Sequence, residues 1–307
     1  MKVIYDLGTT KIKKSAIAIG IFDGVHRGHQ LLIKSMVAQA RRLKAKAVVI
    51  TFFPHPAHVL RPDVFLPYLM SLEHRLKLLE SLGADVVYII RFNKRFAKID
   101  PVYFIEKVLV AQLGVKSVYV GDNFRFGKDR SGDINLFKKL SHKHGYRMHA
   151  VKTLKQSGEV ISSGRLRRLI PAGELKQASH LLGRPVSILG KVIRGAARGK
   201  SLGYPTANIQ YECDILPPCG VYAVRVIWKK KSFYGMANLG FRPSFKEKAP
   251  KAQLEVHIFD FNRSLYGQEI LVEFLQKTRD EHRFASKEAL VCQIQKDESV
   301  VRHLLHI

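Results

Sequence analysis

Residues 16–43 read AIAIGIFDGVHRGHQLLIKSMVAQARRL, and this stretch contains the pattern on which the first half of the chain is built. A short apolar run at 16–22 leads through a turn rich in glycine and histidine into residues 30–43, where apolar residues recur at helical spacing. This order is typical of α/β proteins with a parallel sheet, whose ligands bind beyond the carboxyl ends of the strands. The turn at 20–29 is therefore a candidate ligand site.

The alternation of strand and helix patterns continues to residue 151. Further strands are expected at 47–52, 85–92, 117–120 and 147–151, and further helices at 72–82, 102–113 and 134–144. These patterns predict a Rossmann-like α/β domain with a parallel sheet. After a helical stretch at 173–182, the sequence Gly183-Arg184-Pro185 breaks the pattern, so we expect one domain at 1–182 and a second at 183–307.

The second half has a different pattern, with strands separated by turn residues. The expected strands lie at 221–228, 233–239, 253–261 and 269–275, and a final helix is expected at 286–305. Several antiparallel strands followed by one helix predict a small closed β-barrel with a covering helix.

Composition excludes several classes of protein. The chain has 307 residues, of which 46% are hydrophobic, and no apolar run approaches the roughly 18 residues of a membrane helix. Residues 1–15 lack the pattern of a secretory signal, and the three cysteines include no CxxC pair. We therefore expect a folded cytoplasmic protein without a membrane partner.

The net charge of +27 indicates an anionic partner. Residues 1–180 hold 32 Lys and Arg against 13 Asp and Glu, a net charge of +19. Nucleic acid, an acidic membrane surface and phosphorylated small molecules all fit this charge, and so do solvated helix faces without any partner. Because the sequence shows neither a basic helix nor an aromatic RNA-binding signature, no specific nucleic-acid partner is expected.

The turn at 20–29 has the composition of a phosphate site. Glycines let backbone N–H groups approach an anion at a helix start, and His26 and His29 can donate hydrogen bonds to phosphate oxygens. Half of a metal site or a plain turn are the alternatives. Residues 53–56 and 121–128 follow two other strands and should meet this turn at one sheet edge, where Phe124 and Phe126 could pack against a planar ring.

The second half offers its own candidate chemistry. Glycines at 190, 195, 199 and 203 lead into Tyr204-Pro205-Thr206-Ala207-Asn208. The oxygens of Thr206 and Asn208 could assist Mg²⁺ bound to a nucleotide, although tight β-turns are the simpler interpretation of the glycines. Glu255 alternates with apolar neighbours on its strand and is a candidate general base, or else a solvated carboxylate.

Taken in order, these motifs resemble those of the bifunctional prokaryotic riboflavin kinase/FMN adenylyltransferase family, also called FAD synthetase. The resemblance covers nearly the whole chain. The matching residues lie at 20–29, 120–127, 161–167, 190–208, 220–226, 237–245, 254–261, 265–267 and 279–284.

The resemblance implies two reactions: the barrel phosphorylates riboflavin to FMN with ATP, and the first domain, a nucleotidyltransferase, adenylylates FMN to FAD and releases pyrophosphate. It implies that Glu255 is the base of the kinase, that His26 and His29 stabilise charge in the adenylyltransferase, and that Thr206 and Asn208 organise Mg²⁺ with ATP. The implied nucleotide-binding residues are Gly20, Phe22, Gly28, Asn123, Ser162, Arg167, Gly195, Gly199 and Lys200, and the implied flavin-binding residues are Asn238 and Arg279.

Three positions depart from the family pattern. Gly164 stands where the family usually has Thr or Ser, Phe53 where an acidic residue is common, and Ser244 where Thr is common. The loss of a hydroxyl at Gly164 leaves open the alternative of a riboflavin kinase whose first half binds nucleotide but transfers adenylyl groups weakly or not at all.

Overall fold

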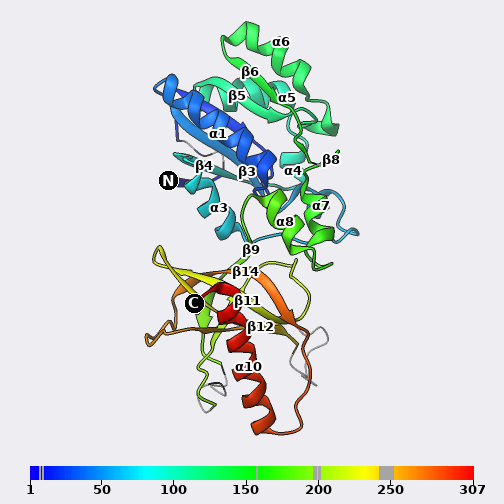
Figure 1. Ribbon diagram of the computed structural model, residues 1–307. Helices are drawn as coiled ribbons and strands as arrows, with labels where there is room; N and C mark the ends of the chain where they lie inside the picture. Colours follow the sequence, from blue (N-terminus) through cyan, green and yellow to red (C-terminus); the bar gives the residue numbers. More distant parts are fainter. Residues whose placement is uncertain (7, 9, 157, 196–198, 200–201, 242–251) are drawn as a thin grey trace. The chain divides into compact units, whose positions relative to one another are not determined.

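The computed structural model describes residues 1–307 except 7, 9, 157, 196–198, 200–201 and 242–251. The chain forms two compact units (Figure 1). The first unit comprises Met1–Pro67 and Leu72–Ser163, and the second unit comprises Tyr68–Ser71 and Gly164–Ile307.

The first unit is built on a six-stranded sheet in which every neighbouring pair is parallel, as the sequence predicted. Its strands are β1 (Lys2–Tyr5), β2 (Ser15–Ile19), β3 (Lys46–Phe53), β4 (Val86–Arg91), β5 (Val115–Gly121) and β6 (Arg147–Val151), in the spatial order β1-β4-β3-β2-β5-β6. β1 was not expected. The sheet order places β2 centrally, so the turn at 20–29 follows an interior strand.

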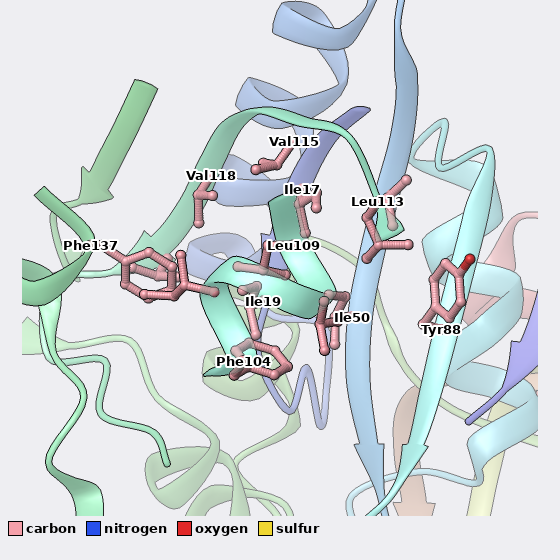
Figure 2. Close-up of a cluster of buried hydrophobic side chains, with 14 of the residues drawn as sticks. Ile17, Ile19, Ile50, Tyr88, Phe104, Leu109, Leu113, Val115, Val118 and Phe137 are labelled. Carbon is pink, nitrogen blue, oxygen red and sulfur yellow. The ribbon is translucent and has the colours of Figure 1, made fainter. Parts of the chain in front are cut away.

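Helices cover both faces of this sheet. α1 (Arg27–Arg42) and α3 (Leu72–Ser81) pack on one face, and the π-helix η1 (Phe104–Gln112) and α6 (Ile134–His144) pack on the other. Side chains of β2 alternate between the two cores: Ile17 and Ile19 join the η1 side, shown in Figure 2, and Ala16 and Ala18 join the α1 side. The shorter elements of the first unit are α2 (Pro56–Leu60), α4 (Lys94–Ala97), α5 (Pro101–Tyr103), η2 (Lys128–Arg130), β7 (Lys155–Gln156) and β8 (Glu159–Val160).

Several element ends differ from the expected ones for local reasons. β2 ends at Ile19 instead of continuing to residue 22, because Phe22 has a φ of 54° that no strand allows. α1 begins at Arg27, three residues early, because the side chain of His26 caps it. The helix expected at 102–113 is α5 followed by η1.

The second unit contains the closed antiparallel barrel that the sequence predicted (Figure 1). Its strands are β9 (Val186–Ile193), β10 (Ala207–Tyr211), β11 (Gly220–Trp228), β12 (Lys231–Gly240), β13 (Gln253–Ile258) and β14 (Glu269–Arg279), in the order β10-β13-β12-β11-β14-β9. β9 and β10 were not expected, because the glycines at 190, 195, 199 and 203 favoured tight turns in this stretch. The final helix, α10 (Lys287–Leu305), packs on Ala223 and Met236 outside the barrel.

Two helices precede the barrel. They are α7 (Ser163–Leu169) and α8 (Leu175–Leu182), and α8 lies against β9 and β14. Gly183 ends α8 with a φ of 68°, a left-handed conformation that favours glycine, so the sequence break at 183–185 falls where the barrel begins. The two compact units nevertheless divide at Ser163, which groups both helices with the second unit.

Candidate active sites

The turn at 20–29 lies at the carboxyl end of β2 and carries two stacked histidines. The rings of His26 and His29 are 3.7 Å apart between centroids and 18° from parallel. Nδ1 of His26 accepts the backbone N–H of His29 over 3.3 Å, so Nε2 carries the proton of the neutral ring. The two histidines expected to act together are therefore brought together at the N-terminus of α1.

Two backbone carbonyls fix the shape of this turn. The carbonyl of Ile21 accepts from Thr51 Oγ1 at 2.9 Å and from Arg75 Nη1 at 3.0 Å, and the carbonyl of Asp23 accepts from Ser163 Oγ at 2.7 Å. The Asp23 carboxylate lies 3.8 Å from Arg75, and both side chains are buried. These contacts hold the turn rigidly.

The glycines of the turn make room for its rings. A Cβ at Gly20 would come within 2.9 Å of the Phe22 ring, and a Cβ at Gly28 within 3.2 Å of the His26 ring. Phe22 itself is only 1% exposed and has a positive φ, which is strained for an aromatic residue. Any nucleotide contact of Phe22 is therefore made by its backbone.

The loop after β5 holds Asn123 in place through Asp122. Asp122 accepts the N–H of Thr153 at 2.9 Å and its hydroxyl at 2.5 Å, and these bonds lower the pKa of the Asp122 carboxyl. Phe124 and Phe126 stack on each other and pack into the core on Phe137. Both rings are partly buried at the edge of the core, so their packing against a planar ligand ring stays a prediction.

The last two residues expected at the nucleotide site of the first unit flank the division between the units. Ser162 immediately precedes α7, and Arg167 lies within α7, which groups with the second unit. Their contacts with nucleotide remain predictions.

In the second unit, strand register aligns four of the predicted kinase residues, together with Val221, in one row across five strands. Asn208 of β10 pairs with Glu255 of β13, which pairs with Asn238 of β12, then with Val221 of β11 and Arg279 of β14. All five line one cavity of about 350 Å³. Residues more than 70 positions apart in the sequence thus share one site. This row, from Asn208 to Arg279, is named the register row below.

Glu255 lies on the outer face of the barrel, as its alternation predicted, while its neighbours Leu254 and Val256 are each 1% exposed inside. Thr206 Oγ1 lies 3.5 Å from Glu255 Oε2, and both line the cavity. The oxygens of Thr206, Asn208 and Glu255 are hard donors of the type that Mg²⁺ prefers. These residues therefore fit a magnesium ion that also binds nucleotide phosphates.

The glycines before β10 pack against these same residues. A Cβ at Gly195 would lie 2.2 Å from Nδ2 of Asn208, and a Cβ at Gly199 would lie 2.3 Å from the carbonyl of Tyr204 and 3.1 Å from Thr206 Oγ1. Gly199 also lines the cavity. Lys200 and Ser244 lie outside the described residues.

Arg279 is engaged by α10. Its Nε and Nη2 donate to the two carboxylate oxygens of Asp297 at 2.8 and 2.6 Å, and its Nη1 donates to the carbonyl of Asp280 at 2.9 Å. The guanidinium also lies 5.7 Å from the centre of the Phe284 ring. Any flavin contact of Arg279 therefore uses the face or remaining edge of its guanidinium.

Sequence reasoning missed several residues of the cavity wall. These lining residues are Tyr204, His257, Glu281, His282, Phe284, Leu290, Ile294 and Asp297. His257 Nδ1 lies 2.8 Å from the carbonyl of Pro205, so Nδ1 donates and steadies the residue before Thr206. Burial, together with the carboxylate of Glu298, raises the pKa of the Tyr204 hydroxyl. The dense run of polar and aromatic residues at 279–284 was the one sequence feature that could have indicated that part of the cavity wall.

A second cavity of about 170 Å³ adjoins the first at Thr206, which lines both. Its other lining residues are Val192, Pro205, Ala207, Val256, Ile258, Phe261, Arg263, Ser264, Leu265 and Tyr266. The wall is mostly apolar and aromatic with one arginine.

Comparisons with known proteins agree over both units. The FAD synthetase family model matches residues 9–165 and the riboflavin kinase family model matches residues 182–305. The bifunctional riboflavin kinase/FMN adenylyltransferase of Escherichia coli K12 is 37% identical over 97% of this chain and 95% of its own length. The Bacillus subtilis protein of the same name is 37% identical over 93% of this chain and 90% of its own length.

A crystal structure named as a macrolide-efflux protein from Streptococcus pneumoniae has the same fold, with a TM-score of 0.84 and 31% identity over 98% of this chain and 99% of its own. Among the described residues of the present chain, none of the helices is long and apolar enough to cross a membrane. From the two family matches and the identity to curated relatives, the chain belongs to the bifunctional riboflavin kinase/FMN adenylyltransferase family.

Proposed function

We propose that the chain makes FAD from riboflavin in two ATP-dependent steps, with the kinase in the second unit and the adenylyltransferase in the first. The observation that carries this proposal is that one cavity is lined by the register row and by Thr206, and therefore by the candidate base, the candidate metal ligands and the candidate flavin residues. The family membership of both halves supports the same conclusion.

In the kinase step, Glu255 accepts the proton of the terminal ribityl hydroxyl while that oxygen bonds to the γ-phosphorus of ATP. The bond from the γ-phosphorus to the bridging oxygen breaks, and ADP leaves with that oxygen. Thr206 and Asn208 would hold Mg²⁺ with the phosphates, and the ion would neutralise the charge that develops on them. We assign the adenine ring of ATP to the second cavity, because its apolar and aromatic wall suits a purine. Thr206 lines this cavity and also lies next to Glu255 in the first cavity.

In the adenylyltransferase step, an FMN phosphate oxygen bonds to the α-phosphorus of ATP and pyrophosphate leaves. The N-terminus of α1 and the stacked rings of His26 and His29 supply hydrogen-bond donors to the charge that grows on the leaving group. The rigid anchoring of the turn means that these donors are in place before the reaction begins.

The remaining features fit this assignment. The positive charge of the chain suits ATP, FMN and pyrophosphate, without a specific nucleic-acid or membrane partner. We place the enzyme in the cytoplasm, and its three free cysteines are compatible with the reducing conditions there.

The test is one incubation with riboflavin, ATP and Mg²⁺ in which flavins are separated over time. FMN should accumulate first and FAD should follow. A parallel incubation that starts from FMN tests the alternative of a kinase with an inactive first unit, since only the bifunctional enzyme converts FMN to FAD. Failure to form FMN from riboflavin would overturn the proposal.

A further inference from the structure

The cavity changes chemical character along the register row. Oxygen-bearing side chains, Asn208 and Glu255, occupy one end of the row, Asn238 lies in the middle, and Val221 with the paired Arg279 forms the other end. Riboflavin and ATP together have the same order of groups: phosphate, terminal hydroxyl, the polyol chain and then the apolar ring. The row is therefore graded in the order in which the two substrates would lie along it.

The spacing of the strands shows which group of riboflavin would lie opposite each residue of the register row. Neighbouring strands are about 4.8 Å apart, and an extended carbon chain with bonds of about 1.5 Å covers that length in about four bonds once its zigzag is allowed for. If Glu255 serves the terminal hydroxyl, Asn238, one strand away, lies beside the secondary hydroxyls of the ribityl chain.

A carboxylate accompanies Asn238 at this position. Oε1 of Glu281 accepts from Nδ2 of Asn238 at 2.9 Å, and both residues line the cavity. The carboxylate lies directly over Gly240, two residues beyond Asn238 on the same face of β12, because a Cβ at Gly240 would come within 1.8 Å of Oε1 and 2.2 Å of Oε2. Glycine at 240 thus provides the space in which Glu281 sits.

We propose that Asn238 and Glu281 form a recognition pair for the secondary hydroxyls of the ribityl chain, which makes Glu281 a specificity-determining residue of the kinase. A carboxylate accepts hydrogen bonds and an amide both donates and accepts, so the pair can satisfy vicinal hydroxyls that do both. The proposal rests on the proposed kinase function at this cavity. It adds that the secondary hydroxyls of the ribityl chain are recognised and that Glu281 recognises them.

The test compares two flavins as kinase substrates: riboflavin, and a flavin whose side chain is a plain pentyl chain that ends in a hydroxyl. Both present a terminal hydroxyl to Glu255, but only riboflavin has secondary hydroxyls. We expect the unaltered enzyme to favour riboflavin in kcat/KM by about tenfold or more, the effect of losing hydrogen bonds to a charged group. Glu281→Ala should lower kcat/KM for riboflavin by about that factor and leave the pentyl analogue nearly unchanged.

Two further variants sharpen the experiment. Gly240→Ala should reproduce Glu281→Ala, because the three atoms nearest to the new methyl group all belong to the Glu281 carboxylate and Gly240 has no positive φ. Asp280→Ala is the matched control, since Asp280 is an exposed neighbouring carboxylate that does not line the cavity, and the preference for riboflavin should persist.

The outcomes separate this inference from the proposed function. If the unaltered enzyme phosphorylates neither flavin, the kinase assignment itself fails. If it phosphorylates riboflavin but does not favour it over the analogue, or if Glu281→Ala slows both substrates equally, the kinase stands and the recognition pair is wrong.

Discussion

Removal of the Asp297 carboxylate should loosen α10 from the barrel. Asp297 is 5% exposed and accepts three N–H groups, two from Arg279 at 2.8 and 2.6 Å and one from Gln293 at 2.9 Å. Loss of one partner of a buried ion pair costs about 3–5 kcal/mol because the other charge stays buried without it. Since 20% of the Arg279 side chain is exposed, we expect Asp297→Ala to cost somewhat less, about 2–4 kcal/mol.

Urea denaturation followed by tryptophan fluorescence measures this loss in the second unit alone. Trp228 is the single tryptophan of the chain and lies in β11 of the barrel. With a urea dependence of about 2 kcal/mol per molar, the midpoint should fall by about 1–2 M. The matched control is Asp280→Ala, which removes an exposed carboxylate that pairs with Lys277 and has no positive φ. The control should not move the midpoint measurably. Equal midpoints for Asp297→Ala and the unaltered chain would show that the Asp297–Arg279 pair does not hold α10 to the barrel.

Four further outcomes are expected. His29→Ala should slow FAD formation from supplied FMN by about 10²–10³-fold and leave riboflavin phosphorylation unchanged, as coupled assays on one preparation can show. A fragment that begins near Leu181 should fold and phosphorylate riboflavin, and a folded fragment that binds neither riboflavin nor ATP would contradict the boundary at 182/183. Thr153→Val should raise the pKa of Asp122, measured by NMR; because the folded pKa lies below the ordinary value, its small stabilising effect is present above about pH 4 and is lost as the pH falls through the folded pKa. Nucleic acids should bind only weakly, with Kd roughly 10⁻⁴–10⁻⁶ M at physiological salt, and submicromolar sequence-selective binding would contradict this.

The sequence predicts the parallel sheet and the barrel well, because both follow from hydrophobic periodicity. The prediction misses the strands in which glycine interrupts the hydrophobic pattern. β9 and β10 contain or adjoin glycines whose missing side chains admit close backbone contact: a Cβ at Gly190 would lie 2.4 Å from the carbonyl of Gln210 on the neighbouring strand. In the sequence such a glycine predicts a turn, whereas in the structure it lies in a strand that packs closely against its neighbour.

In the candidate site, too, local features could be predicted from the sequence, but contacts between residues far apart in the chain could not. Alternation correctly places Glu255 on the outer face of its strand, but only the register shows that Asn208 and Asn238 flank it. The partner of Arg279 was not predictable either, because Asp297 lies 18 residues away on a helix whose docking depends on the folded barrel. For Phe124 and Phe126, the sequence could not show that both rings would also contact Phe137, which lies far along the chain on α6.

Two independent active sites, one around Glu255 and one around His26 and His29, should lose their activities separately. The decisive variant is Glu255→Gln, which keeps the shape of the side chain and removes the base. FMN formation from riboflavin and FAD formation from supplied FMN are measured on the same preparation. We expect the first rate to fall by about 10²–10⁴-fold and the second to stay within about twofold of the unaltered enzyme. An unchanged kinase rate would mean that Glu255 is a solvated strand carboxylate, and an equal fall in both rates would mean that the two reactions do not have separate sites.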